Sequence, residues 1–174
     1  MGLVGACSMR LLEQYGLLHA RGMFPGMSIL QWGPEIAEIV GEFKSKTILD
    51  YGCGLGLQYR RERIHRLWAN SPPVLYDPAV ERYSAKPEGQ FDGVLSTDVL
   101  EHIPEEELDA VLTEIFGYAT QWVFLSVCCR PSKHILFDDG TNVHVTVKPQ
   151  EWWNERIAEF SNGHRAKTIL RFSE

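Results

Sequence analysis

The fold is decided by one stretch of sequence, Thr47-Ile48-Leu49-Asp50-Tyr51-Gly52-Cys53-Gly54-Leu55-Gly56. A short apolar run enters a turn with glycine at every second position, and residues 57–68 then have the composition of a helix. The stretch predicts a strand, a glycine-rich loop and a helix in succession. Because glycine has no Cβ, such a loop can turn sharply and approach a ligand, and we expect the free N–H groups of the following helix to face an anionic group.

Length and composition limit the function classes. The chain has 174 residues, which is enough for one domain with a sizeable core, and its 44% hydrophobic and 23% charged residues are ordinary globular values. The formal net charge is −6, and the one basic cluster falls on a single predicted helix, so a duplex nucleic acid is not an expected partner. We interpret that cluster, Arg60, Arg61, Arg63 and Arg66, as a solvated face.

The cysteines and the hydropathy pattern indicate a cellular location. The four cysteines form no CxxC pair, which is typical of a reducing compartment. No apolar run approaches the roughly 20 residues needed to span a bilayer. We therefore expect a cytoplasmic protein that does not enter a membrane.

The chain before the glycine loop predicts two helices. Residues 9–20 have apolar side chains at a mainly helical spacing and end at a Gly-Pro turn, and a second helix should begin near Pro34. We expect residues 1–45 to pack on the core formed by residues 46–174 as part of a single domain. Position alone suggests that Tyr15, His19 and Phe24 cover the ligand.

An acidic residue follows the glycine loop at an informative distance. Residues 74–77 read as a second short strand that ends in Asp77, about 20 residues past Gly56, where a carboxylate is placed to accept hydrogen bonds from ribose hydroxyls. Nicotinamide and S-adenosylmethionine sites share this feature. Nicotinamide sites have the loop GxGxxG, whereas this chain has GxGxG preceded by Asp50, which favours S-adenosylmethionine.

These motifs resemble those of the class I S-adenosylmethionine-dependent methyltransferases. The resemblance covers roughly residues 48–160 and implies a three-layer Rossmann-like α/β sandwich, with a mostly parallel sheet and helices on both faces. It also implies a set of cofactor-binding residues: Asp50, Gly52, Cys53, Gly54 and Gly56 in the loop, Asp77 and Pro78 after the second strand, and Asp98 after a later strand.

The chain departs from the family pattern at two places. The segment from Asp77 to Phe91 is too short for the helix and strand that normally lie there, so we expect a reduced third-strand edge with no clear adenine contact. The family usually ends in two antiparallel strands, and only residues 167–172 read as a closing strand. Residues 134–147 predict a hairpin or an ordered loop around the turn at 138–142, and residues 149–160 predict a helix whose Trp152 and Trp153 favour the core.

Candidate catalytic residues follow the strand predicted at 91–97. Asp98, Glu101 and His102 have a spacing that brings three side chains to one side of a helical turn, and His144 follows the later turn and could reach them. We take His102, His144 and Asp98 as the catalytic candidates, acting as base or substrate contacts. Asp98 and Glu101 are also spaced as a capping box, which is the alternative without a chemical role.

A metal is the less favoured alternative at the same place. Asp98, Glu101, His102 and His144 resemble the acids and histidines that hold a divalent ion in certain ubiquinone O-methyltransferases and small-RNA terminal 2′-O-methyltransferases. The segment Leu-Glu-His also occurs in class I methyltransferases that use no metal, so we expect none here.

The resemblance predicts an S-adenosylmethionine-dependent methyltransferase whose acceptor is a hydroxyl or amine of a small or sugar-like molecule. Two alternatives stay open. One is an accessory module that binds S-adenosylmethionine without catalysis, and the other is a metal-assisted O-methyltransferase acting on an RNA end. The sequence does not identify the acceptor, because substrate identity depends on the shape of the pocket.

Overall fold

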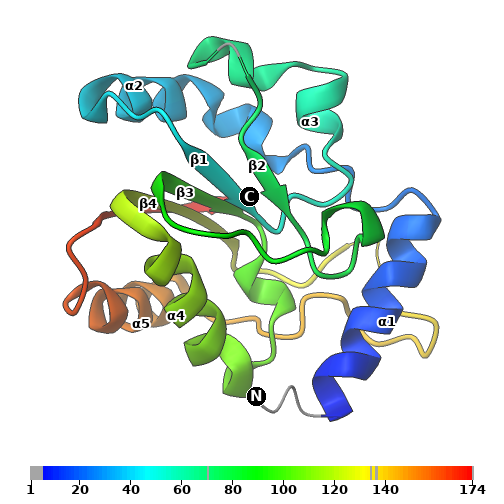
Figure 1. The fold of residues 1–174 in the computed structure, drawn as a ribbon. Helices are drawn as coiled ribbons and strands as arrows, with labels where there is room; N and C mark the ends of the chain where they lie inside the picture. Colours follow the sequence, from blue (N-terminus) through cyan, green and yellow to red (C-terminus); the bar gives the residue numbers. More distant parts are fainter. Residues whose placement is uncertain (1–5, 70, 134, 136, 174) are drawn as a thin grey trace.

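The protein is built on a five-stranded sheet with helices on both faces (Figure 1). The computed structural model describes residues 6–69, 71–133, 135 and 137–173. The strand order is β2-β1-β3-β4-β5, and every pairing of neighbours is parallel. The strands are β1 (Ile48–Tyr51), β2 (Val74–Tyr76), β3 (Phe91–Thr97), β4 (Ala119–Cys128) and β5 (Lys167–Ser173). The predicted Rossmann-like α/β class with a mostly parallel sheet is confirmed.

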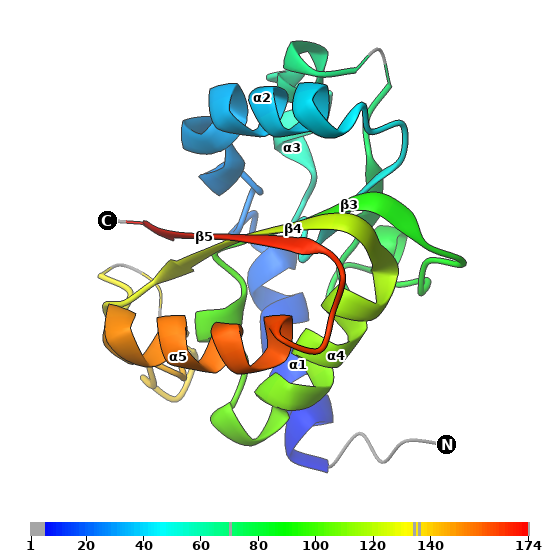
Figure 2. The ribbon, with the colours of Figure 1, turned by 90° about the vertical axis from the view of Figure 1, so that its left-hand side faces the viewer.

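The helices form two layers, one on each side of the sheet (Figure 2). One layer contains α2 (Gly33–Phe43) and α3 (Leu57–Arg60), and the other contains α4 (Leu108–Tyr118) and α5 (Gln150–Ser161). α1 (Ala6–Ala20) packs through Tyr15 and Leu18 on Phe137 and Val143 of a later loop. Short 3₁₀ turns complete the chain: η1 (Ser28–Trp32), η2 (Ile64–Leu67), η3 (Glu81–Tyr83), η4 (Leu100–His102) and η5 (Glu105–Glu107).

The interior strand β4 joins the two layers because successive side chains point to opposite faces. Trp122 and Phe124 belong to the cluster under α2, whereas Val123 and Leu125 belong to the cluster under α4 and α5. All four are fully buried. Trp153 of α5 is also fully buried in the second cluster, which agrees with the prediction that it is a core residue.

The helix predicted over residues 57–68 is wrong in length. α3 ends at Arg60, and Arg63 adopts a left-handed backbone with φ of 54° before η2 begins. The break brings Ile64 against α2, where a Cβ on Gly33 would lie 2.6 Å from its Cδ1. Packing on α2 therefore overrides the helical composition of the segment.

Both predicted departures from the family pattern are present. Residues 77–90 contain η3 and no strand, so β2 forms one edge of the sheet. β5 forms the other edge, parallel to β4 over Trp122 to Cys128. In the part of the chain that the structure describes, no antiparallel strand follows β5.

The segment predicted as a hairpin or an ordered loop is an ordered loop. His134 and Leu136 lie outside the described residues, and residues 143–147 form no strand. The turn is closed by hydrogen bonds from Phe137 N to Thr141 O (2.8 Å) and from Gly140 N to Phe137 O (2.9 Å). Thr146 N donates to Glu101 O at 3.0 Å, which ties the loop to the segment after β3.

Within the described ranges, no helix combines the length and the apolar character that crossing a membrane would require.

Candidate active site

The candidate site lies at the carboxyl ends of the strands, which meet at one edge because the sheet is parallel. The loops after β1 and β2 carry the glycine loop and Asp77, and we call this region the donor side. The segments after β3 and β4, together with Ser173 at the end of β5, line a cavity of about 310 Å³, which we call the acceptor cavity. Its lining includes Phe24, Ser28, Asp98, Glu101, His102, Cys128, Arg130, Pro131, Ser132, Lys133, His144 and Ser173.

On the donor side, the first N–H group of the helix after the loop is not free, contrary to expectation, and two N–H groups of the loop are also bonded. Leu55 N donates to Phe24 O at 3.1 Å, and Leu57 N, at the start of α3, donates to Pro25 O at 3.0 Å. Gly54 N donates to the Asp77 carboxylate at 2.9 Å. Oxygen atoms of the chain itself therefore accept the hydrogen bonds of these three N–H groups.

The 23–26 turn covers the glycine loop. Gly54 has φ of 56°, and a Cβ added there would lie 2.4 Å from Phe24 O. Gly26 fits equally closely, since its Cβ would lie 2.2 Å from Oε1 of Gln58. The Phe24 ring makes edge contacts with Tyr15, His19 and His102 at centroid distances of 5.9, 5.6 and 5.1 Å. The three residues expected to cover the ligand thus lie together over this side.

Asp77 is held from both sides. One carboxylate oxygen accepts from Gly54 N, the other accepts from Ala79 N at 3.0 Å, and Nε2 of His19 lies 3.9 Å away. Burial raises the pKa of Asp77, while the neighbouring His19 opposes that rise. Each carboxylate oxygen has accepted one hydrogen bond and retains capacity for another.

Asp50 lies beneath the loop and is almost fully buried. Nε2 of Gln58 donates to its Oδ2 at 3.2 Å and to Cys53 O at 3.1 Å. Burial raises the pKa of Asp50 to about 7, while the hydroxyl of the buried Tyr59 and the amide of Gln58 oppose that rise. The residue is therefore a buried acid next to the loop.

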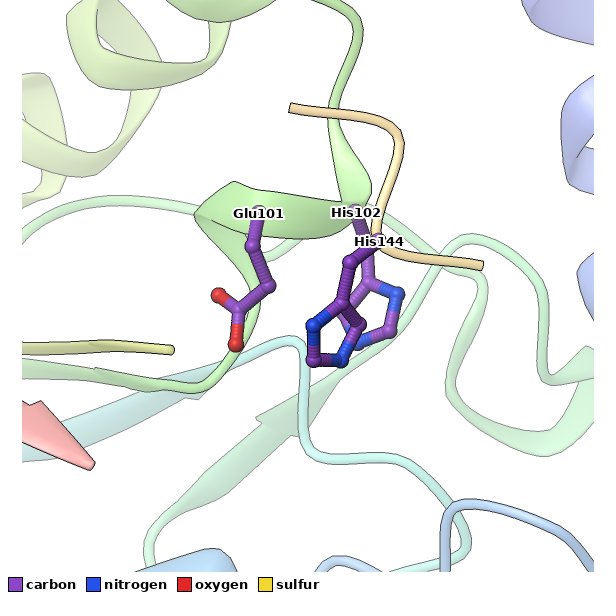
Figure 3. A group of neighbouring side chains, drawn as sticks. All are labelled: Glu101, His102 and His144. Carbon is purple, nitrogen blue, oxygen red and sulfur yellow. The ribbon is translucent and has the colours of Figure 1, made fainter. Parts of the chain in front are cut away.

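In the acceptor cavity, Glu101, His102 and His144 converge (Figure 3). One ligand-type atom from each lies within 4.8 Å of the other two. Glu101 is fully buried, and its Oε1 accepts from Cys128 N at 3.1 Å. Its Oε2 has no partner in the described part of the chain. Burial raises the pKa of Glu101 well above its usual range, and Asp98 adds to the rise.

Backbone carbonyls orient both imidazoles. Nδ1 of His102 lies 3.0 Å from Val143 O, and Nδ1 of His144 lies 2.6 Å from Arg130 O. Because a carbonyl can only accept, each Nδ1 carries the proton in the neutral ring and each Nε2 keeps its lone pair. Burial lowers the pKa of His102 to about 3, with a further contribution from His144. His102 is therefore a poor general base at neutral pH and a suitable neutral ligand.

The placement of Asp98 within a shared helical turn is wrong. Asp98 has φ of 53°, so the helical phase begins only at η4. Its carboxylate accepts from Ser126 Oγ at 2.8 Å, and it is not part of the Glu101–His102–His144 cluster, although it lines the cavity. The capping-box alternative is wrong for Glu101, whose carboxylate accepts from β4 and not from the segment before it.

Sequence reasoning missed Arg130, Lys133 and Ser173, which line the cavity. A signal was present, because Arg130 and Lys133 lie within five residues of the end of β4 and Ser173 ends β5. Residues at those positions belong to the same edge of a parallel sheet as the glycine loop. Gln58 was also missed, since nothing in its sequence context indicates that it bridges Asp50 and Cys53.

The chain is similar to known proteins over much of its length. A family model described as a methyltransferase domain matches residues 27–171. The ubiquinone biosynthesis O-methyltransferase of Bordetella parapertussis is 26% identical over 122 residues, covering 59% of this chain and 51% of that protein. The protein of the same name from Albidiferax ferrireducens is 26% identical over 143 residues, covering 70% of this chain and 55% of that protein.

The chain spans about half the length of the curated relatives it matches. The family match is more extensive, because it runs from before β1 into β5 and includes every residue of the glycine loop. On this evidence the chain belongs to the methyltransferase-domain family, in the class I, S-adenosylmethionine-dependent group.

Proposed function

We propose that this protein transfers a methyl group from S-adenosylmethionine to a hydroxyl of a small acceptor. The observation that carries the proposal is the adjacency of two regions at one sheet edge. The donor side has the glycine loop and a ribose-type acid, and the acceptor cavity has two imidazoles with free Nε2 lone pairs. The relatives named as O-methyltransferases favour a hydroxyl over an amine.

The donor side fits S-adenosylmethionine in its chemistry. Asp77 retains acceptor capacity for ribose hydroxyls, and the buried carboxyl of Asp50 beside the loop offers an acceptor for a cationic amino group. The residues that would hold the cofactor are therefore Asp50, Gly52, Cys53, Gly54, Gly56, Asp77 and Pro78, with Asp98 on the cavity side. The 23–26 turn lies over this loop, so access requires its movement.

When bound, S-adenosylmethionine supplies a methyl group on a sulfonium centre, which leaves a neutral thioether. The chain then has to align the acceptor, and alignment alone can account for roughly 7–11 kcal/mol of a barrier. His144 is the better base, because its side chain lines the cavity and the bond of its Nδ1 to Arg130 O leaves the Nε2 lone pair to take the hydroxyl proton. A positioned base contributes typically about 10²–10⁴-fold.

A metal-assisted reaction is the second candidate, favoured by one observation. Nε2 of His102, Nε2 of His144 and Oε2 of Glu101 have no other partner among the described residues, and the carbonyls on each Nδ1 are the usual outer support of metal-bound histidines. Two imidazoles and a carboxylate with open positions suit a divalent ion that lowers the pKa of a bound hydroxyl.

The experiment has two stages. Calorimetry of the full chain with S-adenosylhomocysteine measures binding to the donor side, with the nicotinamide cofactor as a control ligand. Transfer of labelled methyl from S-adenosylmethionine to a panel of hydroxyl and amine acceptors then measures activity. Binding of S-adenosylhomocysteine with no turnover on any acceptor would favour a non-catalytic module. Displacement of S-adenosylhomocysteine by the nicotinamide cofactor would favour an oxidoreductase.

The same assay distinguishes the metal-assisted reaction from one in which His144 is the base. Turnover is measured after treatment with a chelator and after addition of Mg²⁺, Mn²⁺ or Zn²⁺. The Glu101→Gln variant removes a charged ligand and keeps the shape of the side chain. Loss of turnover with the chelator, recovery with one ion and failure of the variant to recover would favour the metal. Turnover that the chelator leaves unchanged would leave His144 as the base.

A further inference from the structure

The chemical class of the acceptor can be inferred from the charges around the acceptor cavity, an inference that rests on the proposed function. Arg130 and Lys133 lie on the segment after β4 and line the cavity together with His144. Neither forms an ion pair with an acid among the residues that the structure describes. Both side chains are exposed, so their charges are available to a ligand in the cavity.

The backbone that carries Arg130 and Lys133 is held in place relative to His144, the proposed base. Arg130 O accepts from the His144 ring at 2.6 Å. Asn142 bridges the same two segments, accepting from Ser132 N at 3.0 Å and donating to Ser132 O at 2.8 Å. Arg130 and Lys133 are thus presented on a loop that is braced against the segment of His144.

The acids of the cavity do not cancel these charges through contact. The Asp98 carboxylate is bonded to Ser126, and the Glu101 carboxylate is bonded to the backbone of Cys128. A further donor is available, because Oγ of Ser173 at the end of β5 is buried, lines the cavity and has no partner among the described residues. A guanidinium, an ammonium and a hydroxyl form a donor set that suits oxygen anions.

We propose that the acceptor carries a phosphate or a carboxylate in addition to its reacting hydroxyl, and that Arg130 and Lys133 bind this anionic group while the hydroxyl faces His144. The anion places the acceptor, and the two cations select it over a neutral analogue. A neutral analogue of the same shape leaves both cations without a partner in the complex, so it binds more weakly.

Inorganic phosphate and acetate are the probes for this proposal. The full chain is first loaded with S-adenosylhomocysteine, whose binding is measured by calorimetry. Binding of each probe is then measured by calorimetry at constant ionic strength maintained with chloride. The variants are the double change Arg130→Gln with Lys133→Gln, and Arg165→Gln as the matched control. Arg165 is exposed, has no ion pair among the described residues and precedes the opposite end of β5.

We expect one probe to bind the parent and the Arg165→Gln variant alike, and to bind the double variant at least about tenfold more weakly. Stronger binding of phosphate would identify a phosphorylated acceptor, and stronger binding of acetate a carboxylate. Equal affinity of the parent and the double variant, or no binding of either probe to the loaded parent, would overturn the proposal. Failure to bind S-adenosylhomocysteine would instead overturn the proposed function.

Activity gives a second measurement. Hydroxyl acceptors are supplied in matched pairs, each acid with its neutral methyl ester and each phosphate ester with its dephosphorylated form. The anionic member should have the lower KM in the parent and in the Arg165→Gln variant, and the double variant should remove that preference. Preference for the neutral members in the parent would also overturn the proposal.

Discussion

Replacement of Gly54 by alanine tests whether the 23–26 turn is held against the glycine loop. A Cβ at this position would lie 2.4 Å from Phe24 O and 3.3 Å from Gly26 N, both backbone atoms. Neither atom can move without the turn that carries it. The turn must therefore retreat from the loop, and the hydrogen bonds from Leu55 N to Phe24 O and from Leu57 N to Pro25 O must lengthen or break.

The expected loss of stability follows from three contributions. The left-handed backbone of Gly54, with φ of 56°, costs an alanine about 1–2 kcal/mol. Two backbone hydrogen bonds contribute about 1 kcal/mol each to net stability. Alanine restricts the unfolded chain and returns about 0.4–1 kcal/mol. The Gly54→Ala variant should therefore be destabilised by about 2–4 kcal/mol.

Urea unfolding monitored by tryptophan fluorescence measures this difference. The matched control is Gly41→Ala in α2, where an added Cβ has no heavy atom within 4 Å. There alanine should stabilise by about 0.5–1 kcal/mol because it is the better helix former. If Gly54→Ala were as stable as Gly41→Ala, the turn would not be packed on the loop in solution, and the reasoning would be refuted.

Three further substitutions test the site. Asp77→Asn keeps the side-chain shape and removes the negative charge of the carboxylate that accepts hydrogen bonds. We therefore expect the Kd for S-adenosylhomocysteine in calorimetry to rise at least about tenfold. An unchanged Kd would exclude Asp77 from the cofactor site. His144→Ala should lower kcat at least about 10²-fold with little change in that Kd, whereas equal loss of both would assign His144 to the fold. For Asp50, the pKa of about 7 in the folded protein lies above the ordinary value of 3.8. The contribution of the protonated Asp50 carboxyl to the free energy of unfolding is therefore complete below about pH 4, and it is lost as the pH rises toward 7. In urea unfolding between pH 4 and 7, Asp50→Asn should therefore gain stability relative to the parent by about 1.4 kcal/mol per pH unit, and a constant difference would show that the carboxylate is already ionised.

The sheet was predictable because its strands are short apolar runs bounded by turn residues. The run from Trp122 to Cys128 identified β4, and the short segment between Asp77 and Phe91 correctly indicated a missing strand. The end of α3 at Arg60 was not predictable in the same way. It depends on the contact of Ile64 with Gly33, two residues that lie far apart in the sequence.

The candidate site was predictable in part for a related reason. His102 and His144 could be expected to meet, because the loops after parallel strands share one edge. The spacing of Glu101 and His102 from Asp98 did not predict where the Asp98 side chain points. The i, i+3, i+4 rule assumes a continuous helix from Asp98 onward. The φ of 53° at Asp98 interrupts that phase and turns its carboxylate to Ser126.

The cover over the glycine loop links the two sides of the site. Tyr15 Oη donates to Val143 O at 2.7 Å and lies 3.1 Å from the His102 ring, while Phe24 contacts both His102 and the loop. A ligand that takes the place of Phe24 O and Pro25 O must replace two hydrogen bonds, worth about 2 kcal/mol together, which corresponds to about a 30-fold reduction in apparent affinity. Movement of the turn that frees the loop would also withdraw the Phe24 ring from His102. Entry of the donor and exposure of the His102 ring therefore depend on the same residue, Phe24.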